Sequence, residues 1–198
     1  ETAADIMGTT PASVNVSKPA LKYDFYCIYD AEVILKYLSL RQQEVGVYEQ
    51  LLGAAIGKEV FTPKKGKTIP GKAIFLDIAE LYSTTNAQEY ILDGTTGFRA
   101  NALEKMLKGP GKKKASPAWL RTAKVTPGKF NSIEKVLKFL TKDASRVPKD
   151  AKRVVEHSLD FKILQGFYVP TYYVKVTYGE DSKMMRINAV NKNVALKV

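Results

Sequence analysis

Cysteine, histidine and tryptophan are almost absent from this chain, since each occurs once, as Cys27, His157 and Trp119. A single cysteine excludes an intramolecular disulfide, and one Cys with one His excludes a metal site built from those two ligand types. Cys27 lies within an aromatic stretch, residues 23–29, which favours a buried structural thiol over a reactive one. No Gly-x-Ser-x-Gly sequence supplies a nucleophile for His157, so no hydrolytic triad is indicated.

Long apolar runs are also missing. No stretch approaches the roughly 18 to 20 residues that a membrane-spanning helix requires, and the polar start, residues 1–17, lacks the pattern of a signal peptide. We therefore expect no membrane span. The sequence leaves the compartment open, with the cytoplasm or a nucleoprotein particle favoured. Export is the alternative if a leader is removed ahead of Glu1.

Two short motifs resemble phosphate-binding loops. Gly66-Lys67-Thr68 matches the end of a P-loop, but Phe61 stands where that loop requires its first glycine. The sequence 93–97, Asp-Gly-Thr-Thr-Gly, is typical of an ordinary turn after a strand. Neither motif indicates a nucleotide site, and we predict no cofactor and no metal.

Positive charge is concentrated in one quarter of the chain. Residues 105–153 contain fifteen Lys and Arg against three acidic residues, and no acid occurs in residues 105–129. Local positive potential attracts polyanions such as nucleic acid, acidic lipid surfaces or acidic protein tails. The predicted polyanion-binding residues are Lys105, Lys108, Lys112, Lys113, Lys114, Trp119, Arg121, Lys124 and Lys129.

The chemistry of this segment favours contact with phosphates rather than base reading. Lysine predominates over arginine, Gly and Pro let the lysines follow a backbone, and the indole of Trp119 could stack on an unpaired base. The alternative is a solvated basic loop that Trp119 and Leu120 anchor to the core. Further lysines downstream, such as Lys135 and Lys138, lie on the polar side of a predicted helix and could extend the patch.

The hydropathy pattern predicts an α+β fold in which antiparallel β-hairpins pack against a few helices. A strand over Tyr23–Tyr29 is expected to precede a long helix over Ala31–Ile56, in which apolar residues recur at helical spacing. A hairpin follows, with strands over 73–82 and 89–92 and a turn at Ser83–Asn86.

Further helices are expected over 100–108, after the Asn131–Glu134 capping box, and from Pro148 to about Ser158. Strands then cover 171–178, 185–189 and 194–198. The four predicted segments are an extended N-terminal arm (1–20), a helix plus β-hairpin half (21–108), a basic Gly/Pro/Lys loop (109–130), and a helix plus C-terminal hairpin half (131–198). The order helix then hairpin thus occurs twice, either by duplication or because generic hairpins look alike.

The C-terminal hairpin carries a family resemblance. Residues 169–176, Val-Pro-Thr-Tyr-Tyr-Val-Lys-Val, a glycine turn, and residues 186–194, Arg-Ile-Asn-Ala-Val-Asn-Lys-Asn-Val, resemble the terminal hairpin of PepSY-like modules, with Asn193 where that family usually has Gly. The resemblance covers about residues 168–198. It implies a small extracytoplasmic module that interacts with proteins and carries no catalytic residue set.

The function that we predict is a non-catalytic binding or structural protein, which contacts nucleic acid or another polyanion electrostatically and belongs to a nucleoprotein assembly such as a virion interior. A PepSY-like protein-interaction module and a small enzyme with a carboxylate-based site are the alternatives. The N-terminal arm and the aromatic clusters at 23–29 and 167–173 also suit packed sheets, protein partners or self-assembly.

Overall fold

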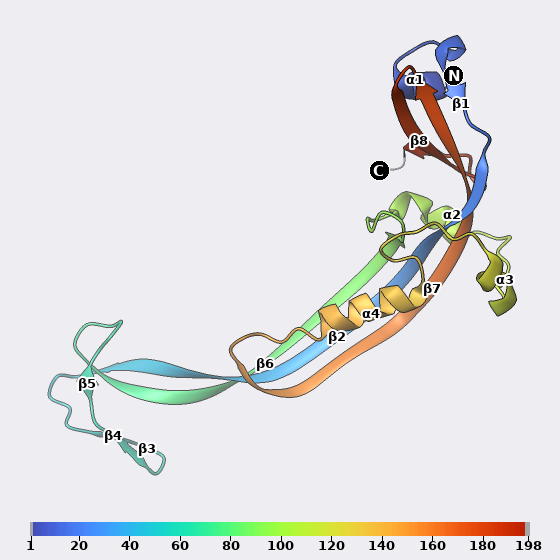
Figure 1. Cartoon of the computed structure of the whole chain (residues 1–198). Helices are drawn as coiled ribbons and strands as arrows, with labels where there is room; N and C mark the ends of the chain where they lie inside the picture. Colours follow the sequence, from blue (N-terminus) through green and yellow to red (C-terminus); the bar gives the residue numbers. More distant parts are fainter. Residues whose placement is uncertain (1, 197–198) are drawn as a thin grey trace. The chain divides into compact units, whose positions relative to one another are not determined.

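The fold is mainly β, as the computed structural model of residues 2–196 shows (Figure 1). Strands hold 52% of the residues and helices 18%, and the main feature is one antiparallel sheet of seven strands. The predicted α+β class is therefore wrong, because two segments predicted as helices fold as strands.

The elements follow one another along the chain in an order that alternates long strands with short helical segments. They are α1 (Thr2–Met7), η1 (Pro11–Ser13), β1 (Asn15–Val16), β2 (Ala20–Val47), β3 (Ala54–Ile56), β4 (Glu59–Phe61), β5 (Lys64–Lys65), β6 (Lys72–Asp93), η2 (Asn101–Leu103), α2 (Glu104–Lys108), α3 (Pro117–Thr122), α4 (Ile133–Ala144), β7 (Ala151–Tyr178), β8 (Asp181–Asn188) and β9 (Val194–Leu196).

The large sheet has the strand order β5-β6-β2-β7-β8-β9, and β1 pairs with β7. The β7–β8 hairpin pairs Thr171 with Asn188 and Tyr178 with Asp181, so the C-terminal hairpin predicted from sequence is confirmed. The strand predicted over 194–198 is present as β9, and its last two residues lie outside the described range. A separate two-stranded sheet joins β3 and β4.

The chain divides into two compact units. Unit 1 contains residues 1–31, 87–143 and 160–198, and unit 2 contains residues 32–86 and 144–159. These units cut across the four predicted segments, since β2, β6 and β7 each contribute to both.

The long helix predicted over Ala31–Ile56 is wrong, because β2 continues through this region to Val47. Its burial alternates with a period of two: Leu35, Tyr37 and Ser39 are buried and the residues between them are more exposed. Apolar residues on both sides of the strand also match a helical spacing, and this ambiguity explains the error.

Two predicted breaks in the strands are wrong as well. The helix predicted from Pro148 to about Ser158 is absent, since β7 begins at Ala151, and the adjacent β-branched residues Val154 and Val155 suit a strand. The predicted turn at Ser83–Asn86 lies inside the continuous strand β6. The helix-then-hairpin order therefore does not occur twice.

Other elements are confirmed. A short helical segment covers 101–108. α4 begins at Ile133, within the predicted Asn131–Glu134 box, and Ser132 rather than Asn131 accepts a hydrogen bond from the backbone N–H of Lys135, at 3.4 Å. Val136 and Leu140 are the buried residues of α4, on the face that the spacing predicted.

The N-terminal segment packs on its own chain within unit 1. Asn15 and Val16 of β1 pair with β7, and Ile6 and Met7 contact a buried cluster that includes Val174. In Figure 1, α1 and β1 lie beside the β7–β8 hairpin.

The turn at 93–97 anchors the core of unit 1. A Cβ atom on Gly94 would lie 2.2 Å from the carbonyl oxygen of Phe130 and 2.7 Å from that of Phe25, so only glycine fits there. Gly94 donates its backbone N–H to Phe25 and accepts from Phe130, at 2.7 and 3.0 Å. The turn predicted from the Asp-Gly sequence is thereby confirmed, with Gly128 packed against it.

Candidate polyanion-binding groove

A groove of about 880 Å³ opens in unit 1 between the basic loop and β7. Its walls come from the end of α2, the loop 110–116, the start of α3 and residues 166–170 of β7. Basic and aromatic side chains are prominent in the lining, among them Tyr23, Lys112, Lys113, Lys114, Trp119 and Tyr168.

Local sequence builds the loop. α2 stops at Gly109, because Pro110 cannot continue the helix and Gly111 adopts the positive φ of 85°. At the other end, Ser116 accepts a hydrogen bond from the backbone N–H of Trp119 at 3.1 Å, and Pro117 occupies the first turn of α3. The two caps set where the lysines leave α2 and where the indole enters the groove.

Trp119 is half-buried and held by two tyrosines. Its ring lies edge-on to Tyr23 at 4.8 Å and to Tyr168 at 5.6 Å between centroids. Edge-to-face contacts of this kind are worth about 0.5–1.5 kcal/mol each beyond the buried area. The groove thus has an aromatic floor whose geometry is fixed before any ligand arrives.

The three consecutive lysines form the rim. Lys113 and Lys114 are exposed, and Lys112 reaches back so that its ammonium donates to the carbonyl oxygen of Leu107 at 3.0 Å and lies 5.6 Å from the ring centre of Phe167. The structure therefore brings four of the predicted site residues, Lys112 to Lys114 and Trp119, into one groove.

The other predicted residues lie outside the groove lining. Lys108 is ion-paired with Glu104 at 2.6 Å, which raises its pKa, and the ammonium of Lys129 lies over the rings of Phe130 and Phe139. The remaining three, Lys105, Arg121 and Lys124, are exposed.

The residues that line the groove give it a positive electrostatic potential. Among the described residues, no Asp or Glu belongs to its walls, so its three lysines have no carboxylate within the lining to neutralise them. A rim of lysines over an aromatic floor can hold phosphates at the edge and flat rings inside.

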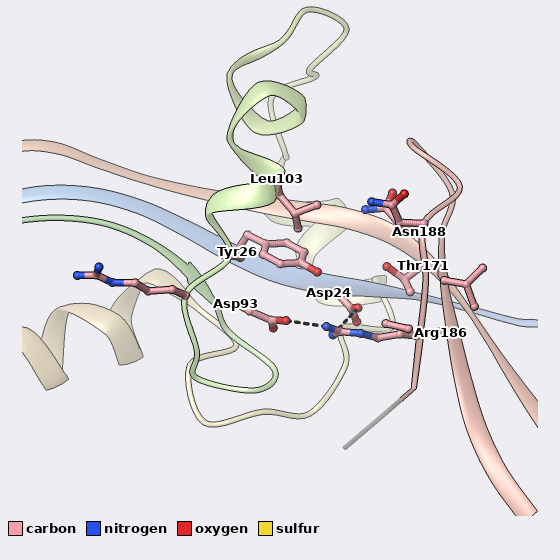
Figure 2. Close-up of a pocket in the computed structure, with 12 residues that line it drawn as sticks. Asp24, Tyr26, Asp93, Leu103, Thr171, Arg186 and Asn188 are labelled. Atoms are coloured by element: carbon pink, nitrogen blue, oxygen red, sulfur yellow. Dashed lines mark hydrogen bonds and ion pairs between the residues drawn. The ribbon is translucent and has the colours of Figure 1, made fainter. Parts of the chain in front are cut away.

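Unit 1 has a second, smaller pocket of about 360 Å³, whose lining contains acidic as well as basic side chains (Figure 2). There Arg186 lies between two buried carboxylates, 2.8 Å from Asp93 and 3.5 Å from Asp24. Tyr173 donates its hydroxyl to Asp24 at 2.6 Å, and the backbone N–H groups of Thr95 and Thr96 donate to Asp93.

Burial and the two carboxylates determine the pKa values of Tyr173 and Arg186. Burial raises the pKa of Tyr173 to about 12, and the hydrogen bond to Asp24 acts in the same direction. Burial lowers the pKa of Arg186, but the hydrogen bond and charge of Asp93 outweigh that effect, so the guanidinium stays charged. The ion pairs of this cluster link β2, the end of β6 and β8. We therefore assign the cluster a structural role.

Residues 2–196 were searched for two further features, a membrane-spanning helix and a cluster of metal ligands. No helix in this range is long and apolar enough to cross a membrane. Nor does the range contain a group of three or more His, Cys, Asp and Glu side chains arranged to hold a metal ion.

Comparison with known proteins gives no match: no family model, no curated protein and no solved structure resembles this chain significantly. The PepSY-like resemblance of the C-terminal hairpin therefore stays a prediction.

Sequence reasoning missed the partners that complete the groove. Tyr23 and Tyr168 belong to aromatic clusters whose pattern favours sheet packing or interfaces, far from the basic loop in the chain. Nothing in the sequence links 23, 119 and 168. Only the pairing of Tyr23 with Val125 and the course of β7 bring the three rings together.

Proposed function

We propose that this chain is a non-catalytic binding protein that holds a polyanion, foremost single-stranded nucleic acid, in the groove of unit 1. The observation that supports it is the coincidence of Lys112, Lys113 and Lys114 with Trp119 in one groove, without an acidic side chain among the described lining residues. The lysines would contact phosphates, and the aromatic floor would receive unpaired bases.

Single strands fit this groove better than a duplex does. A base that stacks on an aromatic side chain must first be unpaired, and stacking contributes about 1–3 kcal/mol per base. Lysine ammonium groups contact phosphates without reading sequence, so we expect binding that tolerates sequence changes and weakens with salt.

The alternatives lack comparable support. A carboxylate enzyme would use the buried pair Asp24 and Asp93, but their oxygens already contact Arg186, Tyr173 and backbone amides. A PepSY-like interaction module is supported by the β7–β8 hairpin alone.

The test is a salt series with single-stranded oligonucleotide. Log K should fall linearly with log salt, and changing Lys112, Lys113 and Lys114 together to Gln should reduce the slope by about 2, or roughly 0.7 for each phosphate that is no longer neutralised. The matched control changes Lys18, Lys162 and Lys175, three exposed lysines of unit 1 outside the groove, and removes the same charge. Equal slopes for the two triple variants would contradict the proposal.

Fluorescence and substitution of Trp119 distinguish the contribution of stacking to affinity from that of charge. It is the only tryptophan of the chain, so its fluorescence reports on this groove alone. Bound single strands should quench it, and Trp119→Ala should weaken binding about 5- to 150-fold with an unchanged salt slope. Trp119→Phe, which keeps a ring, should retain most of the affinity. An unquenched indole at saturating oligonucleotide would refute the stacking role.

A further inference from the structure

The groove of unit 1 reaches both faces of β7. Phe167 and Tyr168 both line it, and because successive side chains of a strand alternate between faces, the two rings lie on opposite sides of the sheet. Tyr168 contacts Trp119 and Phe25 on one side, at 5.6 and 5.2 Å between ring centres. Phe167 packs on the other side, against the buried cluster that contains Leu107. The groove therefore has two separate aromatic surfaces.

The basic loop connects these two surfaces. It leaves α2 after Leu107, which lies on the Phe167 side of β7. It enters α3 ahead of Trp119, which lies on the Tyr168 side. Residues 109–116 therefore pass the edge of β7 and bring three lysines to it. A single strand that followed the loop across this edge would meet an aromatic ring on each side and ammonium groups between them.

The ring of Phe167 is covered by a lysine that can leave it. The ammonium of Lys112 lies 5.6 Å from the ring centre and donates to the carbonyl oxygen of Leu107 at 3.0 Å. Lys112 is itself exposed, and no Asp or Glu among the described residues lines the groove to hold its ammonium there. A contact between an ammonium and a ring is weak at an exposed site, whereas an ammonium and a phosphate attract each other as opposite charges. An incoming phosphate would therefore draw Lys112 away and free the ring.

The size of the groove fits two nucleotides better than one. Its volume of about 880 Å³ lies near the upper end of the roughly 300–1,000 Å³ that pockets for drug-sized ligands span. A dinucleotide, with two bases, two sugars and the phosphate between them, is a ligand of that size. A mononucleotide carries only one base and would leave either Trp119 or Phe167 without a partner for stacking.

We propose that the groove holds two consecutive unpaired nucleotides, with one base on Trp119, the next base on Phe167 and the phosphate between them on Lys112. This inference rests on the proposed function, because it specifies the ligand of the same groove. As the second base binds, Lys112 exchanges its contacts with Phe167 and Leu107 for the phosphate. Phe167 then acts by stacking and Lys112 by charge, so their replacement should affect the salt dependence of binding differently.

A series of oligothymidylates of increasing length tests the number of nucleotides, with quenching of Trp119 fluorescence as the signal and the salt concentration held constant. Adding a second nucleotide to thymidine 5′-phosphate should raise the affinity about 5- to 150-fold, which is the gain from one further stacked base. Each later nucleotide should add only a few-fold, because it finds no further ring in the groove. An affinity that rises by the same factor with every added nucleotide would overturn the proposal.

Phe167→Leu tests the second aromatic surface, because it keeps an apolar side chain against the buried cluster but removes the flat ring. It should remove most of the gain from the second nucleotide and leave the affinity for thymidine 5′-phosphate unchanged. The matched control is Phe139→Leu, since that ring also has a lysine ammonium, from Lys129, at 5.6 Å and lies in unit 1 outside the groove lining. Equal dinucleotide affinities for the two variants would show that Phe167 has no part in binding.

Lys112→Gln tests the exchange. With the longest oligothymidylate of the series it should lower the slope of log K against log salt by about 0.7, whereas Phe167→Leu should leave that slope unchanged. A slope that Lys112→Gln does not alter would refute the move of Lys112 to the phosphate. Circular dichroism checks that each variant folds. If no oligothymidylate quenches Trp119, the proposed function and this inference both fail, whereas quenching without a gain from the second nucleotide refutes this inference alone.

Discussion

Unit 1 buries Phe25, Val136 and Val174 almost completely, whereas unit 2 leaves Leu40, Leu52 and Leu81 more than half exposed. Ion pairs differ in the same way, since Arg186 of unit 1 binds two buried carboxylates while Arg41 of unit 2 binds Glu80 at an exposed position. The contrast shows that the most completely buried large side chains belong to unit 1. Unit 2 buries fewer large side chains, among them Leu35, Tyr37 and Ile74.

This difference has a consequence for function. Tyr23 and Tyr168 hold the ring of Trp119 in the groove before a ligand binds, as a preorganised site requires. In the function proposed above, unit 1 binds the polyanion.

Replacing the arginine of an ion pair should give the largest difference between the units in the loss of unfolding free energy. Arg186→Met leaves Asp24 and Asp93 buried without their cation, so unfolding should become easier by about 3–5 kcal/mol. Arg41→Met, at the exposed pair with Glu80, should cost less than about 1 kcal/mol. Denaturant titrations followed by Trp119 fluorescence and circular dichroism measure both. Equal destabilisation would show that the buried cluster has no special structural role.

A slightly smaller effect is expected from apolar truncation. Leu107→Ala removes a side chain from the core cluster of Tyr26, Ile28 and Val169, and should destabilise unit 1 by about 2–5 kcal/mol. Leu52→Ala, at a largely exposed position of unit 2, should change stability by no more than about 0.5 kcal/mol. If thermal and denaturant unfolding shift equally for the two variants, the contrast between the units does not hold.

Alkaline pH should weaken unit 1. Burial raises the pKa of Tyr29 and of Tyr173 to about 12, above the ordinary value of 10.0, so the folded state holds these protons more tightly than the unfolded state. Their contribution is complete below pH 10 and disappears as pH rises toward 12, on the order of 2 kcal/mol per tyrosine. Stability of unit 1 should therefore fall within this window.

Absorbance at 295 nm checks this expectation, because Tyr29 and Tyr173 should ionise only as unit 1 unfolds. Tyr173→Phe removes one of the two groups together with its hydrogen bond to Asp24, and should reduce the fall in stability between pH 10 and 12. Early ionisation of all tyrosines without unfolding would contradict the raised pKa values.

Local signals in the sequence predict some elements well. The Asp-Gly turn at 93–97, the short helical segment before Gly109, helix α4 and the β7–β8 hairpin all follow from them, because caps, turns and glycines act within a few residues. The run of lysines at 112–114 can also be seen in the sequence, because charge depends only on which residues are present.

The long strands could not be predicted in this way. Between Ala31 and Val47 apolar side chains occur on both sides of β2, so helical and strand periods fit equally well, and only its pairing with β6 and β7 decided between them. Tertiary context likewise decided which lysines share a site. Lys108 is held by Glu104 and Lys129 by two phenylalanine rings, although both look equivalent to Lys113 in the chain.

The placement of charge, the turn at 93–97, the helix end at Gly109 and the lack of thiol pairs therefore follow from the amino-acid order alone, since each depends on composition or on residues that are close in the chain. The turn predicted at Ser83–Asn86 and the cap predicted at Asn131 did not follow in this way, because β6 continues through the first and Ser132 takes the place of the second. Tertiary structure decided the rest. It brought Tyr23 and Tyr168 to Trp119 and placed Arg186 between Asp24 and Asp93. These features arise from contacts between strands far apart in sequence, and burial energies that depend on such contacts cannot be read from local pattern.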